Sequence, residues 1–301
     1  MAPTYSRSTS SDPQNGQSWP PPGRASPIPC RVPLPAGWAV KLDNVPAMVV
    51  DYELDGRVAI ITIRRPEARN AVNAEVAAGI EAAIDRLEEE ADTWVGVVAG
   101  EGPVFSAGAD LKAIAAGDAA GLMTPRGGFG GIAYRERTKP LIAAVDGPAL
   151  AGGCEIALAC DMIVASRDAV FGLPEVKRSL VAAAGGLFRL PRVLGPNVAM
   201  EVILTGEPIS AERAYQLGMV NQLVEPGRAL EAALALAGKI TNNAPMAVWA
   251  SRKVAVRAFT AEDATLSSQT NELFSHVAQT EDFAEGPRAF IEKRAPQWKG
   301  R

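Results

Sequence analysis

The chain has 301 residues, of which 48% are hydrophobic and 21% are charged, so it can bury a sizeable core in one large domain or two smaller ones. Its 30 Lys and Arg residues against 34 Asp and Glu residues give a net charge of −4, and no Lys/Arg-rich run could follow a phosphate backbone, so no nucleic-acid partner is expected. No apolar stretch reaches the length of a membrane span, and the polar N-terminus lacks a signal-peptide core. The three cysteines lack the spacing of a zinc site or a redox pair, so a cytoplasmic protein without membrane association is expected.

Composition divides the chain into three parts. Residues 1–47 hold ten of the 23 prolines amid polar residues, which predicts a disordered tail. Residues 48–210 alternate strand and helix patterns and predict an α/β core, whereas residues 211–301 read as mostly helical. Because Met48 opens the first orderly segment, the tail is an upstream extension of the reading frame or, in the less favoured interpretation, a functional arm. Deleting it is expected to leave melting temperature and activity nearly unchanged.

Strands and helices alternate from residue 49 onward. Two runs rich in β-branched residues flank Asp55-Gly56 and predict a β-hairpin at 49–54 and 58–64. The other elements follow from hydrophobic periodicity and from the length of each apolar run. They are helices at 74–90, 152–159, 228–240, 246–257, 262–280 and 281–294, and strands at 94–99, 141–145, 162–165 and 219–224.

A turn of small residues at 105–112 follows a predicted strand and opens a helix, with Asp110 placed to cap its first turn. Gly108 can adopt dihedral angles closed to other residues, and Ala109 then presents its N–H where the partial positive charge of a helix N-terminus collects. That N–H could bind a developing oxyanion. An ordinary strand-to-helix turn is the alternative interpretation.

A second turn of the same kind, at 146–155, strengthens the first interpretation. Gly152 offers another N–H at a helix N-terminus, and two converging donors are what a thioester oxygen needs as it becomes an enolate. Glu155 lies three residues further on, on the same face of the first turn, in a helix that is otherwise apolar all round. Glu155 is therefore a candidate catalytic group, and a carboxylate that merely complements the helix N-terminus is the alternative.

Glu175 is the next carboxylate in an apolar setting, twenty residues after Glu155. Burial raises a carboxyl pKa, and two neighbouring carboxyls split their pKa values so that one holds a proton while the other is ionised. The pair Glu155 and Glu175 therefore suits acid–base chemistry, although Glu175 taken alone would more often be a surface residue at a turn.

Several motifs together resemble the signature of the enoyl-CoA hydratase/isomerase (crotonase) family, over roughly residues 49–300. They are Ile142-Ala143-Ala144-Val145-Asp146-Gly147, Ala151-Gly152-Gly153-Cys154-Glu155, Cys160-Asp161, Arg65-Pro66, Asn70-Ala71-Val72-Asn73, Ser106-Ala107-Gly108-Ala109-Asp110-Leu111, Gly185-Gly186, Arg189-Leu190-Pro191 and Glu292-Lys293-Arg294. The resemblance implies a crotonase-type spiral of ββα repeats with a helical C-terminal region that caps the core and mediates assembly. It also implies a homotrimer, often paired into a hexamer.

The same resemblance assigns roles to individual residues. Ala109 and Gly152 become the oxyanion-hole donors, Glu155 takes a proton from the water that attacks C3, and Glu175 protonates C2. The remaining positions implied to contact the acyl-CoA substrate are Ala107, Gly108, Asp110, Lys112 and Lys299, although solvated surface positions are an equal alternative for the two lysines. Coenzyme A is part of the substrate, and no separate cofactor is expected.

The presence of both glutamates favours hydration of a 2-enoyl-CoA to a 3-hydroxyacyl-CoA, because relatives with other activities often lack one of them. An isomerase, a dehydratase of another acyl-CoA such as a carnitinyl-CoA-like substrate, and an idle scaffold or RNA-binding relative are the alternatives. The chain departs from the best-known hydratases at 179–183 and at the preceding Lys177-Arg178, which predicts a different acyl pocket. The glycine-rich segment, residues 113–131, is expected to form a mobile wall of that pocket.

Other site classes find little support. The only histidine, His276, lies in a predicted helix far from any Gly-x-Ser-x-Gly nucleophile motif. No glycine run has dinucleotide-binding spacing, and no cluster has metal-ligand spacing, so neither a nicotinamide cofactor nor a metal is expected.

Overall fold

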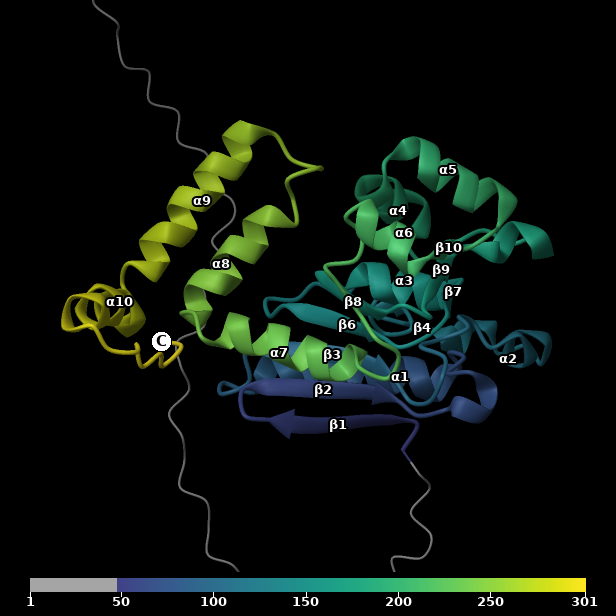
Figure 1. Ribbon diagram of the computed structural model, residues 1–301, viewed down its shortest axis with the longest axis horizontal. Coiled ribbons are helices and arrows are strands. Elements are labelled where there is room, and N and C mark those ends of the chain that lie inside the picture. Colours follow the sequence, from purple (N-terminus) through teal and green to yellow (C-terminus); the bar gives the residue numbers. More distant parts are fainter. Residues whose placement is uncertain (1–47) are drawn as a thin grey trace, which may run out of the picture. The chain divides into compact units, whose positions relative to one another are not determined.

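The computed structural model describes residues 48–301, and the tail expected at 1–47 lies outside the described residues. A six-stranded sheet has the order β1-β2-β3-β6-β8-β11 (Figure 1). β1 and β2 pair antiparallel as the expected hairpin, and the other neighbours are parallel. These strands are β1 (Val50–Asp55), β2 (Val58–Ile63), β3 (Val95–Gly100), β6 (Leu141–Val145), β8 (Met162–Ser166) and β11 (Gln222–Val224).

Helices and short elements surround this sheet. A three-stranded sheet has the order β10-β9-β7, and β4 pairs with β5. The helices are α1 (Ala74–Glu89), α2 (Leu111–Ala115), α3 (Gly152–Ala159), α4 (Gly186–Leu194), α5 (Pro196–Thr205), α6 (Ala211–Gln216), α7 (Ala229–Thr241), α8 (Pro245–Ala255), α9 (Asp263–Val277) and α10 (Glu281–Glu292). The short strands are β4 (Met123–Thr124), β5 (Gly128–Phe129), β7 (Ala149–Leu150), β9 (Val170–Gly172) and β10 (Ile209–Ser210), and the 3-10 helices are η1 (Pro66–Ala68), η2 (Ala119–Leu122) and η3 (Pro174–Arg178).

The large sheet is covered on both faces, as a parallel sheet requires. Successive residues of a strand point to opposite faces, so Val97 of β3 packs in a cluster with α7 while Val98 packs in the cluster that contains α1. Figure 1 shows α7 running alongside β2 and β3. The mixed α/β class with helices at the C-terminus is thereby confirmed.

Helix α1 forms because polar side chains pair with backbone groups at both of its ends and because one of its faces is apolar. The Asn73 side chain caps the first turn by accepting the Val76 N–H at 3.0 Å. At the other end, the buried Lys139 ammonium donates to the Leu87 and Glu90 carbonyl oxygens, each at 2.6 Å. Four residues that are fully buried on this face stabilise the fold by roughly 1.5–3 kcal/mol each. They are Val76, Ile80, Ile84 and Leu87.

The helical C-terminal region is joined to the core at several points. β11 pairs with β8, so the large sheet continues across residue 210, the boundary expected between core and helical region. The Arg252 Nε of α8 donates to both carboxylate oxygens of Asp161 at 2.9 Å, and Asp161 also pairs with Arg137 at 3.2 Å. No helix within residues 48–301 is both long and apolar enough to cross a bilayer.

Candidate active site

The two small-residue turns expected from the sequence lie against each other. Ser106 forms a parallel bridge with Ala149, and the Leu150 N–H donates to the Ser106 carbonyl at 3.0 Å. A Cβ added at Gly108 would lie 2.7 Å from the Gly152 nitrogen, so only a glycine allows this approach. The structure therefore brings the candidate donors Ala109 and Gly152 into one place.

Each candidate donor is oriented by its neighbours. Gly108 has a φ of 86°, and its carbonyl accepts the Val72 N–H at 2.8 Å, which fixes the turn before Ala109. Ala151 precedes α3 with φ 51° and ψ −128°, a conformation rare for residues with a side chain, and it places Gly152 first in the helix. Within residues 48–301, neither the Ala109 N–H nor the Gly152 N–H donates to another protein group. Both N–H groups can therefore donate a hydrogen bond to a ligand oxygen.

Glu155 is a buried carboxylate held by backbone donors. Its side chain is 3% exposed, and its Oε1 accepts the N–H groups of Ala184 at 2.7 Å and Gly186 at 2.9 Å, just before and at the start of α4. Burial raises the pKa of Glu155 from 4.5 to about 7; the Gly186 N–H opposes this rise, and the charge of Glu175 adds to it. A carboxyl with this pKa can accept and release a proton near neutral pH.

Glu175 faces the same site from η3. It is half-buried, and its Oε2 is enclosed by protein without a hydrogen-bond partner among the described residues. Burial raises the pKa of Glu175, against the opposing effects of its own N–H and the Arg178 charge. Because the charge of Glu175 also acts on Glu155, the structure brings the two candidate carboxyls near each other, and their joint catalytic role stays a prediction.

Of the other residues expected near the substrate, Asp110 and Ala107 make contacts that stabilise the first turn, whereas Lys112 is exposed. Asp110 caps α2, as predicted, by accepting the Lys112 N–H at 3.0 Å, and it pairs with Arg65 at 3.1 Å. Its carboxylate is therefore engaged in building the turn. Ala107 donates its N–H to the Arg69 carbonyl at 3.0 Å, which also serves the turn, whereas the Lys112 side chain extends from the exposed side of α2.

Lys299 lies in a different part of the described chain. Its N–H donates to Asp282 and its ammonium to Glu281, both at 2.7 Å, so its contacts are with α10. The structure does not bring Lys299 together with the two turns, and its contact with the acyl-CoA substrate stays a prediction.

Sequence reasoning missed the role of Arg189. From α4, this side chain donates to the Ala184 carbonyl at 3.0 Å and to the Ala133 carbonyl at 2.5 Å, and its charge lowers the pKa of Glu155. It therefore holds the segment that donates to Glu155. The Arg189-Leu190-Pro191 motif marked the position, but a contact with a residue 56 positions away leaves no local signal.

A second missed group is the buried polar framework behind the first turn. The Ser106 hydroxyl donates to the Asn70 carbonyl at 2.8 Å and accepts the Gly108 N–H at 3.2 Å. The Asn70 amide donates to the Glu101 and Val104 carbonyls at 2.9 and 2.7 Å. These buried groups are paired as the interior requires, so they stabilise the turn that carries Ala109.

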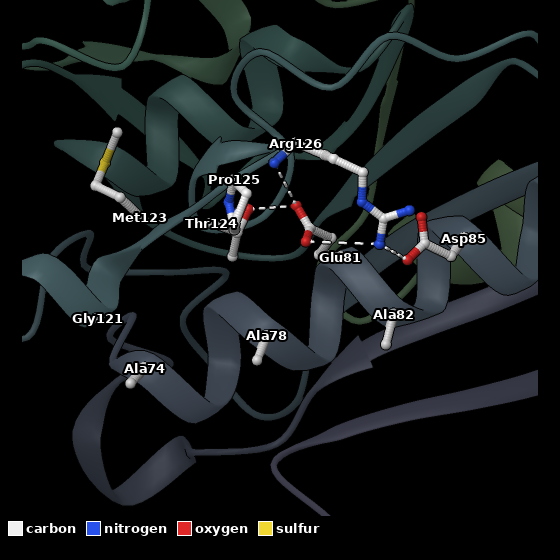
Figure 2. A pocket seen from close by; sticks show the side chains of 10 residues that line it. All are labelled: Ala74, Ala78, Glu81, Ala82, Asp85, Gly121, Met123, Thr124, Pro125 and Arg126. Carbon is white, nitrogen blue, oxygen red and sulfur yellow. Dashed lines mark hydrogen bonds and ion pairs between the residues drawn. The ribbon is translucent and has the colours of Figure 1, made fainter.

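Two surface cavities are lined by neither Glu155 nor Glu175. One of about 380 Å³ lies between α1 and the glycine-rich segment (Figure 2), and one of about 580 Å³ is lined by Arg57, Trp94 and residues 295–298, among others. Within residues 48–301, no three His, Cys, Asp or Glu side chains are grouped so that they could hold a metal ion.

Known proteins share this architecture. Residues 53–301 match the family model for enoyl-CoA hydratase/isomerase. A carnitinyl-CoA dehydratase of Salmonella typhi is 39% identical over 253 residues, which are 82% of this chain and 97% of that protein. An enoyl-CoA hydratase structure from Mycobacterium tuberculosis H37Rv has 48% identity and a TM-score of 0.81, over 84% of this chain and all of that one. A carnitinyl-CoA hydratase structure from Mycobacterium avium has 46% identity and a TM-score of 0.68, over 84% of this chain and 99% of that one.

The site thus combines buried Glu155 and half-buried Glu175 with two backbone N–H groups that have no protein acceptor among the described residues. The chain belongs to the enoyl-CoA hydratase/isomerase family of the crotonase superfamily, which confirms the family and the crotonase fold predicted from its motifs. It is accordingly a lyase of the crotonase type, of the class that adds or removes water.

Proposed function

We propose that this enzyme is an enoyl-CoA hydratase, which adds water reversibly to a 2-enoyl-CoA thioester. The observation that carries the proposal is the pairing of two buried carboxyls that differ in their partners. Glu155 is fixed through Oε1 by two backbone donors, whereas Oε2 of Glu175 is enclosed without a partner among the described residues. A buried oxygen without a partner is costly unless water or substrate pairs with it.

In the proposed mechanism, the thioester oxygen accepts the N–H groups of Ala109 and Gly152, which stabilise the enolate. Ionised Glu155 removes a proton from water as the water oxygen bonds to C3, and protonated Glu175 gives its proton to C2. The hydroxyl and the hydrogen together add one water across the double bond. Return of the proton from Glu155 to Glu175 restores the starting state, and no separate cofactor is needed beyond the CoA of the substrate.

Dehydration of a carnitinyl-CoA-like substrate is the second candidate, because relatives carrying that name are similar over nearly their whole length. The charges around the glutamates favour an uncharged acyl group instead. The cationic groups of Arg178 and Arg189 act on Glu175 and Glu155. A trimethylammonium group bound beside the reacting carbons would meet these two like charges, which the single negative charge of ionised Glu155 does not balance.

The test compares hydration of crotonyl-CoA, a longer enoyl-CoA and the 4-trimethylammonio derivative of crotonyl-CoA. We expect the uncharged substrates to be preferred by kcat/KM. Incorporation of solvent ¹⁸O at C3 separates hydration from double-bond isomerisation, which adds no oxygen. Preference for the cationic substrate would favour the second candidate, and a lack of turnover with all three would reject the hydratase proposal.

We further propose that the chain assembles as a homotrimer or hexamer through its C-terminal helices. Large apolar side chains are exposed there, including Phe259 at 77%, Phe290 at 85% and Ile291 at 77%. Such side chains commonly mark an interface. Light scattering would give the assembly mass, and a monomer would contradict this proposal. An idle scaffold or RNA-binding role is less well supported, since both glutamates are present and the chain carries a net charge of −4.

A further inference from the structure

One carboxylate oxygen of Glu81, in α1, accepts hydrogen bonds from three residues of the glycine-rich segment. Oε2 of Glu81 accepts the Thr124 hydroxyl at 2.5 Å and the Arg126 N–H at 3.2 Å (Figure 2). The same oxygen accepts the Gly127 N–H at 2.7 Å. Burial alone would raise the pKa of Glu81, but these hydrogen bonds outweigh it and hold that pKa below its ordinary value. Asp85, one helical turn further on, pairs with the Arg126 guanidinium.

The segment held by Glu81 fits tightly between two helices. On one side, a Cβ added at Gly131 would lie 2.3 Å from the Ala77 carbonyl oxygen of α1. On the other side, a Cβ added at Gly152 would lie 2.4 Å from the Phe129 ring. A cavity separates α1 from residues 121–126, but the packing at Gly131 and at Gly152 leaves no room for residues 129–131 to shift by themselves. A displacement of this part of the segment must therefore reach the Phe129 ring that packs on Gly152.

Gly152 is one of the two donors for the thioester oxygen, and its position relative to the reacting carbons decides the rate. Displacement of a catalytic contact by about 1 Å costs on the order of 100-fold in turnover. The carboxylate of Glu81 takes no part in the chemistry itself, because all its described contacts are with the glycine-rich segment.

We propose that Glu81 is a positioning residue: it fixes the 124–127 turn so that Phe129 holds the Gly152 end of the oxyanion hole in place. This inference rests on the proposed function, because its first test measures enoyl-CoA turnover. A merely structural role for Glu81 would instead lower the stability of the whole protein and leave turnover of the folded fraction unchanged.

Three variants separate these roles. Glu81→Ala removes the acceptor, whereas Glu81→Gln keeps one carbonyl oxygen that can accept the Thr124 hydroxyl and the Gly127 N–H. Glu89→Ala is the matched control, because Glu89 lies on the same helix, is exposed and has no side-chain hydrogen bond or ion pair within residues 48–301. For each protein, kcat and KM with short and long enoyl-CoA substrates are measured together with the melting temperature.

We expect Glu81→Ala to lose roughly 10- to 100-fold in kcat, while Glu81→Gln and Glu89→Ala stay within about threefold of the parent. A folded Glu81→Ala variant with the parent kcat would overturn the proposal. Equal losses of kcat in the Ala and Gln variants would also overturn the proposal, because the hydrogen bonds that the residue 81 side chain accepts would then not determine the rate. If the Ala variant does not fold, Thr124→Val removes one of the three donors with little change of shape, and unchanged kcat in that variant counts against the proposal.

A readout independent of activity separates this inference from the hydratase proposal. Arg126 is exposed, and the peptide bond that follows it is held through the Gly127 N–H. Trypsin is therefore expected to cleave after Arg126 at least about tenfold faster in Glu81→Ala than in the parent or the Glu89→Ala control, since cleavage needs local opening. Faster cleavage in a protein that turns over no enoyl-CoA would refute the hydratase proposal alone, whereas unchanged cleavage would refute the anchoring role of Glu81.

Discussion

Replacing Glu155 with glutamine removes a buried charge and keeps the shape of the side chain. The amide oxygen of the substituted side chain can still accept the N–H groups of Ala184 and Gly186, so the fold should be retained. Proton removal from water is no longer possible, and we expect kcat for enoyl-CoA hydration to fall by roughly 100- to 10,000-fold. Retention of more than about a tenth of the parent kcat would reject Glu155 as the general base.

The same substitution should change stability in a way that depends on pH. Glu155 has a pKa of about 7 in the folded protein against an ordinary value of 4.5. The folded state therefore binds the proton more tightly than the unfolded state, and the parent loses stability as pH rises from about 4.5 through about 7. The difference between the two values, at 1.36 kcal/mol per pH unit, amounts to about 3 kcal/mol.

Glutamine cannot ionise, so the variant escapes this loss. Relative to the parent, the Glu155→Gln protein should gain stability between pH 5 and pH 8 by up to about 3 kcal/mol, a shift of several degrees in Tm for a domain of this size. Thermal unfolding of both proteins at matched concentration and at both pH values measures the difference. A difference that does not change with pH would show that burial does not raise the pKa of Glu155, and the account of the pair would fail with it.

Further predictions address the rest of the site and the fold. Glu175→Gln should also lose roughly 100- to 10,000-fold in kcat, and the double variant should lose far less than the product of the single losses, as steady-state kinetics can show. Gly152→Pro should lower kcat by at least roughly 100-fold, because it removes the N–H and also places a Cβ 2.4 Å from the Phe129 ring; near-normal turnover would remove Gly152 from the oxyanion hole. The parent kcat should rise with pH as Glu155 ionises near pH 7; a flat profile contradicts its assignment as the general base. Asp161→Ala leaves Arg137 and Arg252 without their shared partner and should destabilise the protein by about 3–5 kcal/mol in denaturant unfolding; a loss below about 1 kcal/mol would mean that this ion pair does not hold α8 on the core.

The parts of the site that sequence could predict are those written in consecutive residues. The turn glycines, Ala109 and the start of α3 follow from local small-residue patterns that the structure reproduces. The Leu141–Val145 strand and the Gly152–Ala159 helix lie where their apolar patterns placed them. The short strands β7 and β10 were missed because two residues are too few for a period to be recognised.

What sequence could not predict is the set of partners that meet across the fold. Glu155 accepts hydrogen bonds from the N–H groups of Ala184 and Gly186, 29 and 31 positions away. The residues next to Glu155 in the sequence do not indicate these partners. The sequence does not distinguish Glu81 from the other charged residues of α1, since its three donors lie more than forty positions further on. Such contacts are fixed by packing of the whole chain, and only coordinates reveal which carboxylates they engage.

The backbone conformation of Ala151 places the free-energy cost of orienting Gly152 on folding and not on substrate binding. A positive φ at a residue with a side chain costs of order 1–3 kcal/mol, and here it aims the Gly152 N–H. The chain meets this cost once, when it folds, and the Gly152 N–H, the proposed oxyanion donor, is then in position before any substrate binds. A loop that adopted the conformation only on binding would meet it again in each cycle and would weaken substrate affinity roughly 5- to 150-fold. The enzyme thus trades a permanent loss of stability for a site that needs no rearrangement between one turnover and the next.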